Sequence, residues 1–321
     1  MSNTAAGIHA HPTHKLGLRP PSRKPALLLG DILTGVAPAH PATADHFGQL
    51  AFGLYENDKY GDCGPTSVAN LVRLVTGGLL GTELQPSQDD VFDLYRRSGN
   101  PNFDPKTDAD DNGVDMQTML EALVAGGIGN GNGNGNGTKL KPIAFAKVDV
   151  TSDDQLTAAV SIFGGCLWGV DLQTAQQAQT DAHPPKWDYH HSGEWGGHAI
   201  VNGAYENGAL EDVISWGTRV QTTATFRRHQ LQEAWVVVWP WNLDHPAFQQ
   251  GIDVNALAAA YKSLTGRDLP LPATPPPLPA GTDPDSVMWQ ATKAWAAKSH
   301  SGDTKKVAAA LNAWAAAKHL S

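Results

Sequence analysis

The pattern of apolar and polar positions divides the chain into a helical first half and a strand-rich second half. In the first half, apolar residues recur three and four positions apart, which predicts helices from about Cys63, over 87–97 and over 114–125. In the second half, short apolar runs are bounded by glycines and polar turns, and a helix is predicted over 153–163. The predicted strands cover 142–148, 166–172, 196–205, 210–216, 222–226 and 234–239. This order predicts an α+β fold with an antiparallel sheet.

Segments of unusual composition flank this central region, which we place at 26–242. Residues 1–25 are rich in His, Pro, Ser and Arg, which predicts an extended arm, and the apolar stretch 26–33 is expected on the domain surface. The alternating Gly and Asn residues of 129–137 predict a flexible connector or a hairpin tip. The predicted segments after the domain are a connecting helix in 243–268 (helical over 254–264), a Pro-rich linker over 269–284 and an Ala-rich helical appendage over 285–321.

Charge and composition narrow the classes of partner. The formal net charge is −9, from 23 basic and 32 acidic residues, and no long basic patch occurs. We therefore expect neither nucleic acid nor anionic membrane as a partner. No apolar run is long enough to span a bilayer, and the polar residues 1–12 lack the apolar core of a secretory signal. These features predict a cytoplasmic or virion-associated protein.

The polar, turn-rich stretch 56–67 delivers one of only two cysteines, Cys63, to the start of an apolar helix. A thiol at a helix N-terminus lies near the positive end of the helix dipole, which favours the thiolate and lowers the pKa. Such a cysteine is suited to be a nucleophile, given a histidine from elsewhere in the fold. A small buried cysteine that only packs is the competing interpretation, and it is the one we favour for Cys166. No CxxC pair occurs, which excludes a cysteine zinc site.

Three short motifs in a fixed order carry a family resemblance. They are Gly61-Asp62-Cys63-Gly64, Gly197-His198-Ala199-Ile200-Val201 and Ser215-Trp216-Gly217. With them, residues 15–242 resemble the papain-like cysteine peptidases. The chain is similar in particular to papain-like proteins of bacteria and their phages, through Asn57 to Cys63, Asp111-Asn112-Gly113 and Glu233-Ala234-Trp235-Val236. The resemblance implies a helical half carrying Cys63, packed on an antiparallel sheet half carrying His198.

The resemblance also implies roles for individual residues. The Cys63 thiolate would attack a carbonyl carbon, and His198 would hold the thiolate as an ion pair and then protonate the leaving group. Asn57 lies six residues before Cys63, where the family carries a glutamine, and would donate to the oxyanion together with the Cys63 N–H.

The residue that should orient the histidine departs from the family pattern. An asparagine is expected immediately before Ser-Trp-Gly, and this chain has Ile214. Asp212 lies on the same strand face as Ile214 and is the possible substitute, whereas Ser215 is expected to point to the other face. Either a Cys63–His198 dyad acts unaided, or Asp212 orients the imidazole, or the site is degraded.

Other candidate sites are weaker, and we expect no metal and no cofactor. The stretch 108–113 matches the opening of a calcium loop, but its twelfth position is Met119 rather than a glutamate, which favours an acidic turn before a helix. The loop 173–194 has no trusted metal spacing and is interpreted as a lid beside the cleft. Its histidines and acidic residues are His183, His190, His191, Asp181, Asp188 and Glu194. The arm residues His9, His11 and His14 are not expected to bind a metal.

Two classes of function remain open from the sequence. The first is a papain-like cysteine peptidase or amidase that cleaves a peptide or isopeptide bond in a peptide or protein substrate, or the same dyad used for acyl transfer. The second is a catalytically weak or inactive papain-like scaffold that serves as a structural or binding component of a phage or secreted assembly. Assembly through the C-terminal helices is part of that second hypothesis.

Overall fold

A computed structural model describes residues 11, 13–35, 40–130, 139–206 and 210–271. The predicted appendage 285–321, almost all of the linker 269–284 and most of the connector 129–137 lie outside the described residues. The domain boundaries drawn from the sequence therefore stay predictions.

One mixed sheet runs through the described chain, with the strand order β2-β8-β3-β5-β6-β7-β4 and with β1 paired to β5. Neighbouring strands are antiparallel except β4 and β7, which are parallel. The long central strand β5 also carries the Gly-His motif. The strands are β1 (Thr43–Asp45), β2 (Ala144–Val148), β3 (Cys166–Gln173), β4 (Lys186–Trp187), β5 (Glu194–Glu206), β6 (Leu210–Ser215), β7 (Thr218–Thr223) and β8 (Leu231–Val238).

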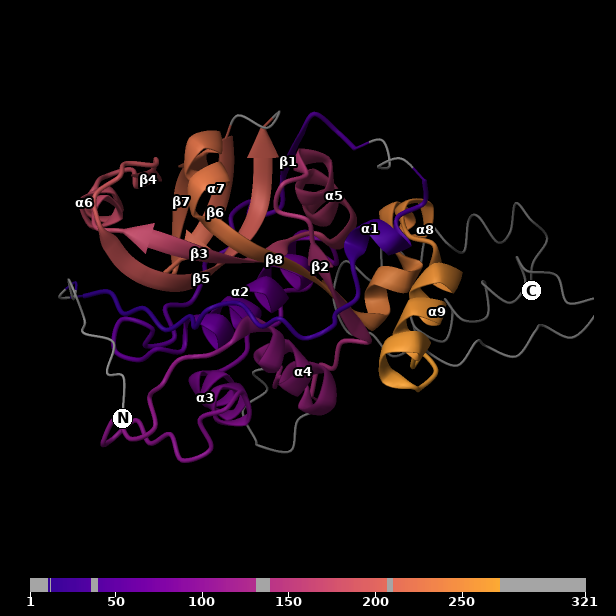
Figure 1. Cartoon of the computed structure of the whole chain (residues 1–321), viewed down its shortest axis with the longest axis horizontal. Helices are drawn as coiled ribbons and strands as arrows, with labels where there is room; N and C mark the ends of the chain where they lie inside the picture. The colour runs from indigo at the N-terminus through magenta and orange to yellow at the C-terminus, as the bar shows by residue number, and fades with distance from the viewer. Residues whose placement is uncertain (1–10, 12, 36–39, 131–138, 207–209, 272–321) are drawn as a thin grey trace, which may run out of the picture. The chain divides into compact units, whose positions relative to one another are not determined.

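The helical half packs on one face of this sheet. It consists of α2 (Cys63–Gly78), α3 (Gln88–Arg97) and α4 (Met116–Gly126), and Figure 1 shows α3 and α4 beside α2. The side chain of Ser87 accepts a hydrogen bond from the Asp90 N–H and begins α3 as predicted, and Asp115 caps α4 in the same way. The predicted helices over 87–97 and 114–125 are therefore confirmed to within a residue or two at their ends.

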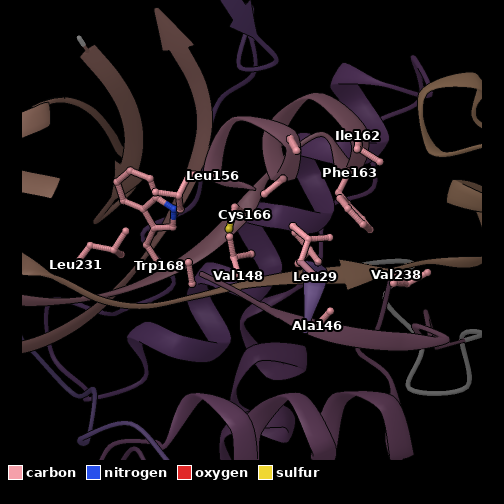
Figure 2. Close-up of a cluster of buried hydrophobic side chains, with 14 of the residues drawn as sticks. Leu29, Ala146, Val148, Leu156, Ile162, Phe163, Cys166, Trp168, Leu231 and Val238 are labelled. Carbon is pink, nitrogen blue, oxygen red and sulfur yellow. The ribbon is translucent and has the colours of Figure 1, made fainter. Parts of the chain in front are cut away.

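The opposite face of the sheet carries a second core. Along β8, Ala234, Val236 and Val238 belong to this core, while Trp235 and Val237 face the helical half, because side chains alternate along a strand. Cys166 lies in the same core, as predicted, among the side chains shown in Figure 2. The helices on this side are α1 (Leu29–Ile32), α5 (Asp153–Phe163), α8 (Pro246–Gly251) and α9 (Val254–Thr265).

Three local predictions need correction. The segment 26–33, expected on the surface, buries Leu29 and Ile32 completely in the second core. The loop 173–194 contains α6 (Ala175–Asp181) and β4. The strand predicted over 222–226 ends at Thr223, because the Thr223 side chain caps a helix, α7 (Ala224–Gln230).

The remaining element is a 3-10 helix, η1 (Pro240–Asp244). Over the described residues, no helix combines the length and the apolar character that crossing a bilayer requires.

Candidate active site

Cys63 is the first residue of α2 and is fully buried. Burial raises the pKa of its thiol to about 12, although nearby backbone groups of Ala199, Gly17 and Gly64 favour the thiolate. The pKa lowering expected from the helix N-terminus is therefore not realised in this state, because loss of solvent outweighs the helix dipole. The thiol is protonated at neutral pH.

His198 lies on β5 and is also fully buried. Its Nε2 is 2.9 Å from the Ser215 hydroxyl oxygen, and its ring stacks on Trp216 with centroids 4.2 Å apart. Within the described part of the chain the Nδ1 atom has no hydrogen-bond partner, so no such bond joins it to Cys63 in this state. Burial lowers the pKa of His198 to about 3, and the charge of His14 adds a smaller effect. The imidazole is therefore neutral at neutral pH.

A two-residue hairpin places Ser215 and Trp216 against His198. Ser215 at the end of β6 pairs with Thr218 at the start of β7, and φ is positive at both Trp216 (46°) and Gly217 (73°), as in a type I′ turn. A side chain at positive φ is strained, so the turn depends on the glycine that follows Trp216. This geometry holds the indole flat on the imidazole.

Ser215 points to the face opposite Ile214, as expected, but the expectation that His198 lies on the face of Ile214 is wrong. Ile214, which pairs with Val201, packs into the core of the helical half, and Ser215 points to the opposite face of β6, as alternation along a strand predicts. Ser215 therefore projects to the face that carries His198. The serine, rather than a residue at position 214, meets the imidazole.

Asp212 and Asn57, the other predicted site residues, both have partners elsewhere. The Asp212 carboxylate lies 2.6 Å from the Arg219 guanidinium, opposite Ala204 on β5, and not against His198. The Asn57 amide is buried and donates to the Tyr60 carbonyl at 3.0 Å and to the Asp62 carboxylate at 3.2 Å. Asn57 thus contacts the residue immediately before Cys63, but its amide donors are engaged.

A segment of the predicted arm, residues 14–19, lies across the site, and we call it the covering segment. Its backbone is hydrogen-bonded to both halves of the fold. Leu18 N–H donates to the Gly197 carbonyl at 3.1 Å, Val114 N–H donates to the Gly17 carbonyl at 2.8 Å, and Arg19 N–H donates to the Val114 carbonyl at 2.8 Å. An extended chain therefore bridges the loop before α4 and strand β5 above Cys63.

Glycines make room for the covering segment. A Cβ atom on Gly17 would lie 2.0 Å from the Gly61 carbonyl oxygen, and one on Gly113 would lie 2.0 Å from the Gly17 carbonyl oxygen. A Cβ on Gly197 would lie 2.4 Å from the Leu18 carbonyl oxygen. Three of these glycines belong to motifs noted in the sequence, yet their shared role as a seat for one extended strand was not predicted.

Asp111 anchors the covering segment on the helical side. Its carboxylate lies 2.6 Å from the Lys15 ammonium and accepts hydrogen bonds from the Gly61 N–H at 2.9 Å and the Tyr95 hydroxyl at 2.7 Å. On the sheet side, the Trp216 indole donates to the Lys15 carbonyl at 3.2 Å. The acidic turn that resembled a calcium loop therefore fixes the cysteine loop and the covering segment together.

Solved structures place this arrangement among known folds. No protein-family profile and no curated protein sequence matches the chain. The structure is similar to xylellain, a cysteine protease from Xylella fastidiosa, with a TM-score of 0.53 and 12% identity over 72% of this chain and 98% of that one. It is also similar to proCathepsin B S9 from Trypanosoma congolense, with a TM-score of 0.50 and 10% identity over 71% of this chain and 86% of that one. The chain therefore has the papain-like fold, with the helical half bearing Cys63 packed on the sheet half bearing His198.

Proposed function

We propose that the chain is a papain-like cysteine peptidase with Cys63 as nucleophile and His198 as its acid–base partner, held closed by its own covering segment. The observation that carries this proposal is the covering segment itself. It is an extended peptide whose backbone is hydrogen-bonded to Gly197 and Val114 above a buried Cys63. Strand-like backbone pairing of this kind is one general way in which proteins bind extended peptides.

The closed site is uncharged, and opening it would change that. Water that enters when the segment leaves removes the burial that now opposes charge on both Cys63 and His198. The free Nδ1 of His198 can then take the thiol proton, while Ser215 holds the ring through Nε2. The covering segment thus suppresses formation of the thiolate–imidazolium pair.

The reaction follows from these groups. The Cys63 sulfur attacks the carbonyl carbon, and the proton on His198 passes to the leaving amine as the C–N bond breaks. A water molecule, deprotonated by His198, then attacks the thioester carbon and releases the acid and the thiol. The Cys63 N–H at the start of α2 is one oxyanion donor. Asn57 is the second, once its contact with Asp62 is released.

The covering segment also indicates the substrate class. Its two leucines contact both cores, since Leu16 packs against the core that includes Trp216 and Leu18 packs against the core of the helical half. An extended peptide with apolar side chains on both sides of a small residue would repeat these contacts. We therefore favour peptide bonds over isopeptide bonds as the target.

A second candidate function is a catalytically silent scaffold that binds a partner, for example within a phage or secreted assembly. The observation in its favour is the burial and neutrality of both Cys63 and His198. Under this reading the covering segment is a permanent part of the fold.

The proposal is tested by assaying the full-length Gly17→Ala chain for hydrolysis of an unfolded protein substrate. The added methyl group clashes with the Gly61 backbone and loosens the covering segment. We expect hydrolysis by this chain, its loss when Cys63→Ala is added, and its retention when Cys166→Ala is added instead. Hydrolysis that survives Cys63→Ala would overturn the assignment. A folded Gly17→Ala chain with an alkylatable Cys63 and no hydrolysis would favour the scaffold.

A further inference from the structure

Two histidines and a carboxylate meet where the arm reaches the end of α6. His11 Nε2 lies 3.2 Å from the Asp181 carboxylate, and His14 Nδ1 lies 2.8 Å from His11 Nδ1. With one ligand atom taken from each residue, the three atoms all lie within 4.8 Å of one another. The residues come from segments that are 170 positions apart in the sequence, so tertiary structure brings them together.

We propose that His11, His14 and Asp181 form a binding site for a divalent transition-metal ion, with Zn²⁺ as the best fit, which fastens the arm to the end of α6. From the sequence alone, neither a metal nor a ligand role for His11 and His14 is expected. Binding by these three residues does not depend on the proposed peptidase activity.

The chemistry of the three residues suits zinc. Imidazole nitrogens and carboxylate oxygens bind Zn²⁺ at about 2.0–2.2 Å, and ligand atoms at the corners of such a tetrahedron stand about 3.3–3.6 Å apart. His11 would coordinate through Nε2, which lies 3.2 Å from the Asp181 oxygen, close to this spacing. One ligand atom from each of the three residues lies within 4.8 Å of the others, so rotation of the His14 side chain would complete the set. Two histidines and one carboxylate leave a fourth position open.

The fourth position has a source of ligands beside it. A cavity of about 230 Å³ is lined by His14, Asp181, His183, Ser215 and Trp216 among others. A cavity of this size holds several water molecules, any of which can complete the coordination. His183 lines the same cavity and is a protein alternative to water as the fourth ligand.

Surrounding rings hold the two histidines in place. His11 lies 5.7 Å from Trp195 and His14 lies 4.5 Å from Trp216, measured between ring centroids. Packing that restrains ligand side chains before a metal arrives strengthens binding. The hydroxyl of Thr13, 3.1 Å from His14 Nδ1, gives the nitrogen a partner that the ion would replace.

The proposed metal site is connected to the active site through packed aromatic rings. His14 packs on Trp216, and Trp216 stacks on His198, so an ion that ties His14 to Asp181 also holds the covering segment over the active site. We therefore expect Zn²⁺ to slow release of the segment. This step rests on the proposed closure of the cleft.

Calorimetric titration of the untagged, full-length Cys63→Ala chain with ZnCl₂ tests the site, since that variant removes a competing thiol. We expect one ion per chain. His11→Ala and Asp181→Asn should each weaken binding by about tenfold or more, as loss of a ligand does, while His191→Ala, in the same loop region, should leave it unchanged. Failure to bind Zn²⁺, or equal binding by the His11→Ala variant, would overturn the site.

Iodoacetamide labelling of Cys63, followed by mass spectrometry, tests the fastening. Zn²⁺ should slow labelling of the wild-type chain several-fold and leave the labelling rate of the His11→Ala chain unchanged. Slowing that persists in His11→Ala would place the ion at Cys63 itself and overturn the fastening. If zinc binding fails while Cys63-dependent hydrolysis is observed, this inference alone is wrong. If zinc binds and hydrolysis is absent, the site stands without the peptidase.

Discussion

The two cysteines are equally buried, but different parts of the chain enclose them. Both thiols are fully buried, and burial raises the pKa of each to about 12. Cys166 is enclosed by the central sheet, where its sulfur lies 3.4 Å from the Trp235 carbonyl oxygen of the neighbouring strand. Cys63 is enclosed by an extended segment held by a few backbone hydrogen bonds and one ion pair to Asp111.

Burial alone therefore does not distinguish Cys63, the proposed nucleophile, from a core residue such as Cys166. Uncovering Cys166 requires unfolding of the sheet, whereas uncovering Cys63 requires only local release of residues 14–19. Around Cys63 the structure also supplies a helix N-terminus and an imidazole with a free Nδ1. Four variants test this difference between Cys63 and Cys166, and the first is expected to have the largest effect.

Replacing His198 should remove the chemistry that distinguishes the two regions. In the Gly17→Ala background, we expect His198→Ala to lower kcat/KM for peptide hydrolysis by about 10³-fold, because proton transfer and thiolate formation are both lost. His190→Ala, an exposed histidine, is the matched control. Equal activity of the two variants would contradict the assignment of His198.

Gly17→Ala should make the two thiols differ in reactivity. A Cβ atom on residue 17 would lie 2.0 Å from the Gly61 carbonyl oxygen, and accommodating it costs about 1–3 kcal/mol in the closed state. This cost favours release of the covering segment, so we expect iodoacetamide to label Cys63 about five- to 150-fold faster. The labelling rate of Cys166 should not change. The control is Gly30→Ala, where the nearest atoms belong to the flexible Gln155 side chain. Acceleration at both thiols would mean global loosening rather than release of the covering segment.

Ser215→Ala should have a smaller effect on turnover. One neutral hydrogen bond contributes about 0.5–1.5 kcal/mol, so we expect kcat to fall about three- to tenfold with little change in KM. Ser215→Thr should restore most of the rate, and Thr218→Ala on the same hairpin should not lower it. A rise in KM that accompanies the fall in kcat would indicate a structural role in the hairpin instead.

Glu233→Gln should have the smallest effect, on stability rather than rate. Burial raises the pKa of this carboxyl to about 7, so its contribution to stability is present below about pH 4.5 and is lost as the pH rises through 7. The amide oxygen of glutamine can keep the bond from the Trp235 indole, 2.7 Å long in the wild type. We expect the variant to gain about 1 kcal/mol over the wild type in unfolding free energy between pH 5 and pH 6.

Glu233 also lies near the covering segment, because a Cβ atom on Gly169 of β3, the strand that carries Cys166, would contact both the Glu233 side chain and the Leu18 side chain. Glu121→Gln on the exposed surface is the control for denaturant titrations at both pH values. A difference that shrinks toward high pH would mean that the carboxylate is stabilised as an anion, contrary to its burial.

The sequence predicted the parts of the fold that local pattern controls. The helices that begin after Ser87 and Asp115 follow from capping residues and apolar periodicity, and the strands β3, β5 and β8 follow from apolar runs. Short elements such as α1 and α6 escaped, because a helix of about one or two turns has too little periodicity to detect and depends on tertiary packing.

The candidate site was predicted only in part, for reasons visible in the structure. Cys63 and His198 stand in recognisable motifs. The role of Ser215 was missed because the family pattern puts the orienting residue at position 214, whereas His198 lies on the face opposite Ile214, which local sequence does not reveal. The cover over Cys63 was missed because its seat is assembled from glycines far apart in the chain, and no one glycine signals a close approach by another strand.

The covering segment is joined to the domain it covers, and this connection sets the terms for any substrate. A tethered occupant acts at an effective concentration that corresponds to the millimolar range for short flexible links, and this value does not fall when the protein is diluted. Under the proposed function, a peptide in solution would bind only the open fraction of molecules, and its apparent dissociation constant would be raised by the inverse of that fraction. A substrate would then have to bind more tightly than Leu16-Gly17-Leu18 to displace this segment. Weakly binding peptides would be excluded even when they are abundant, and a tightly binding peptide would be accepted.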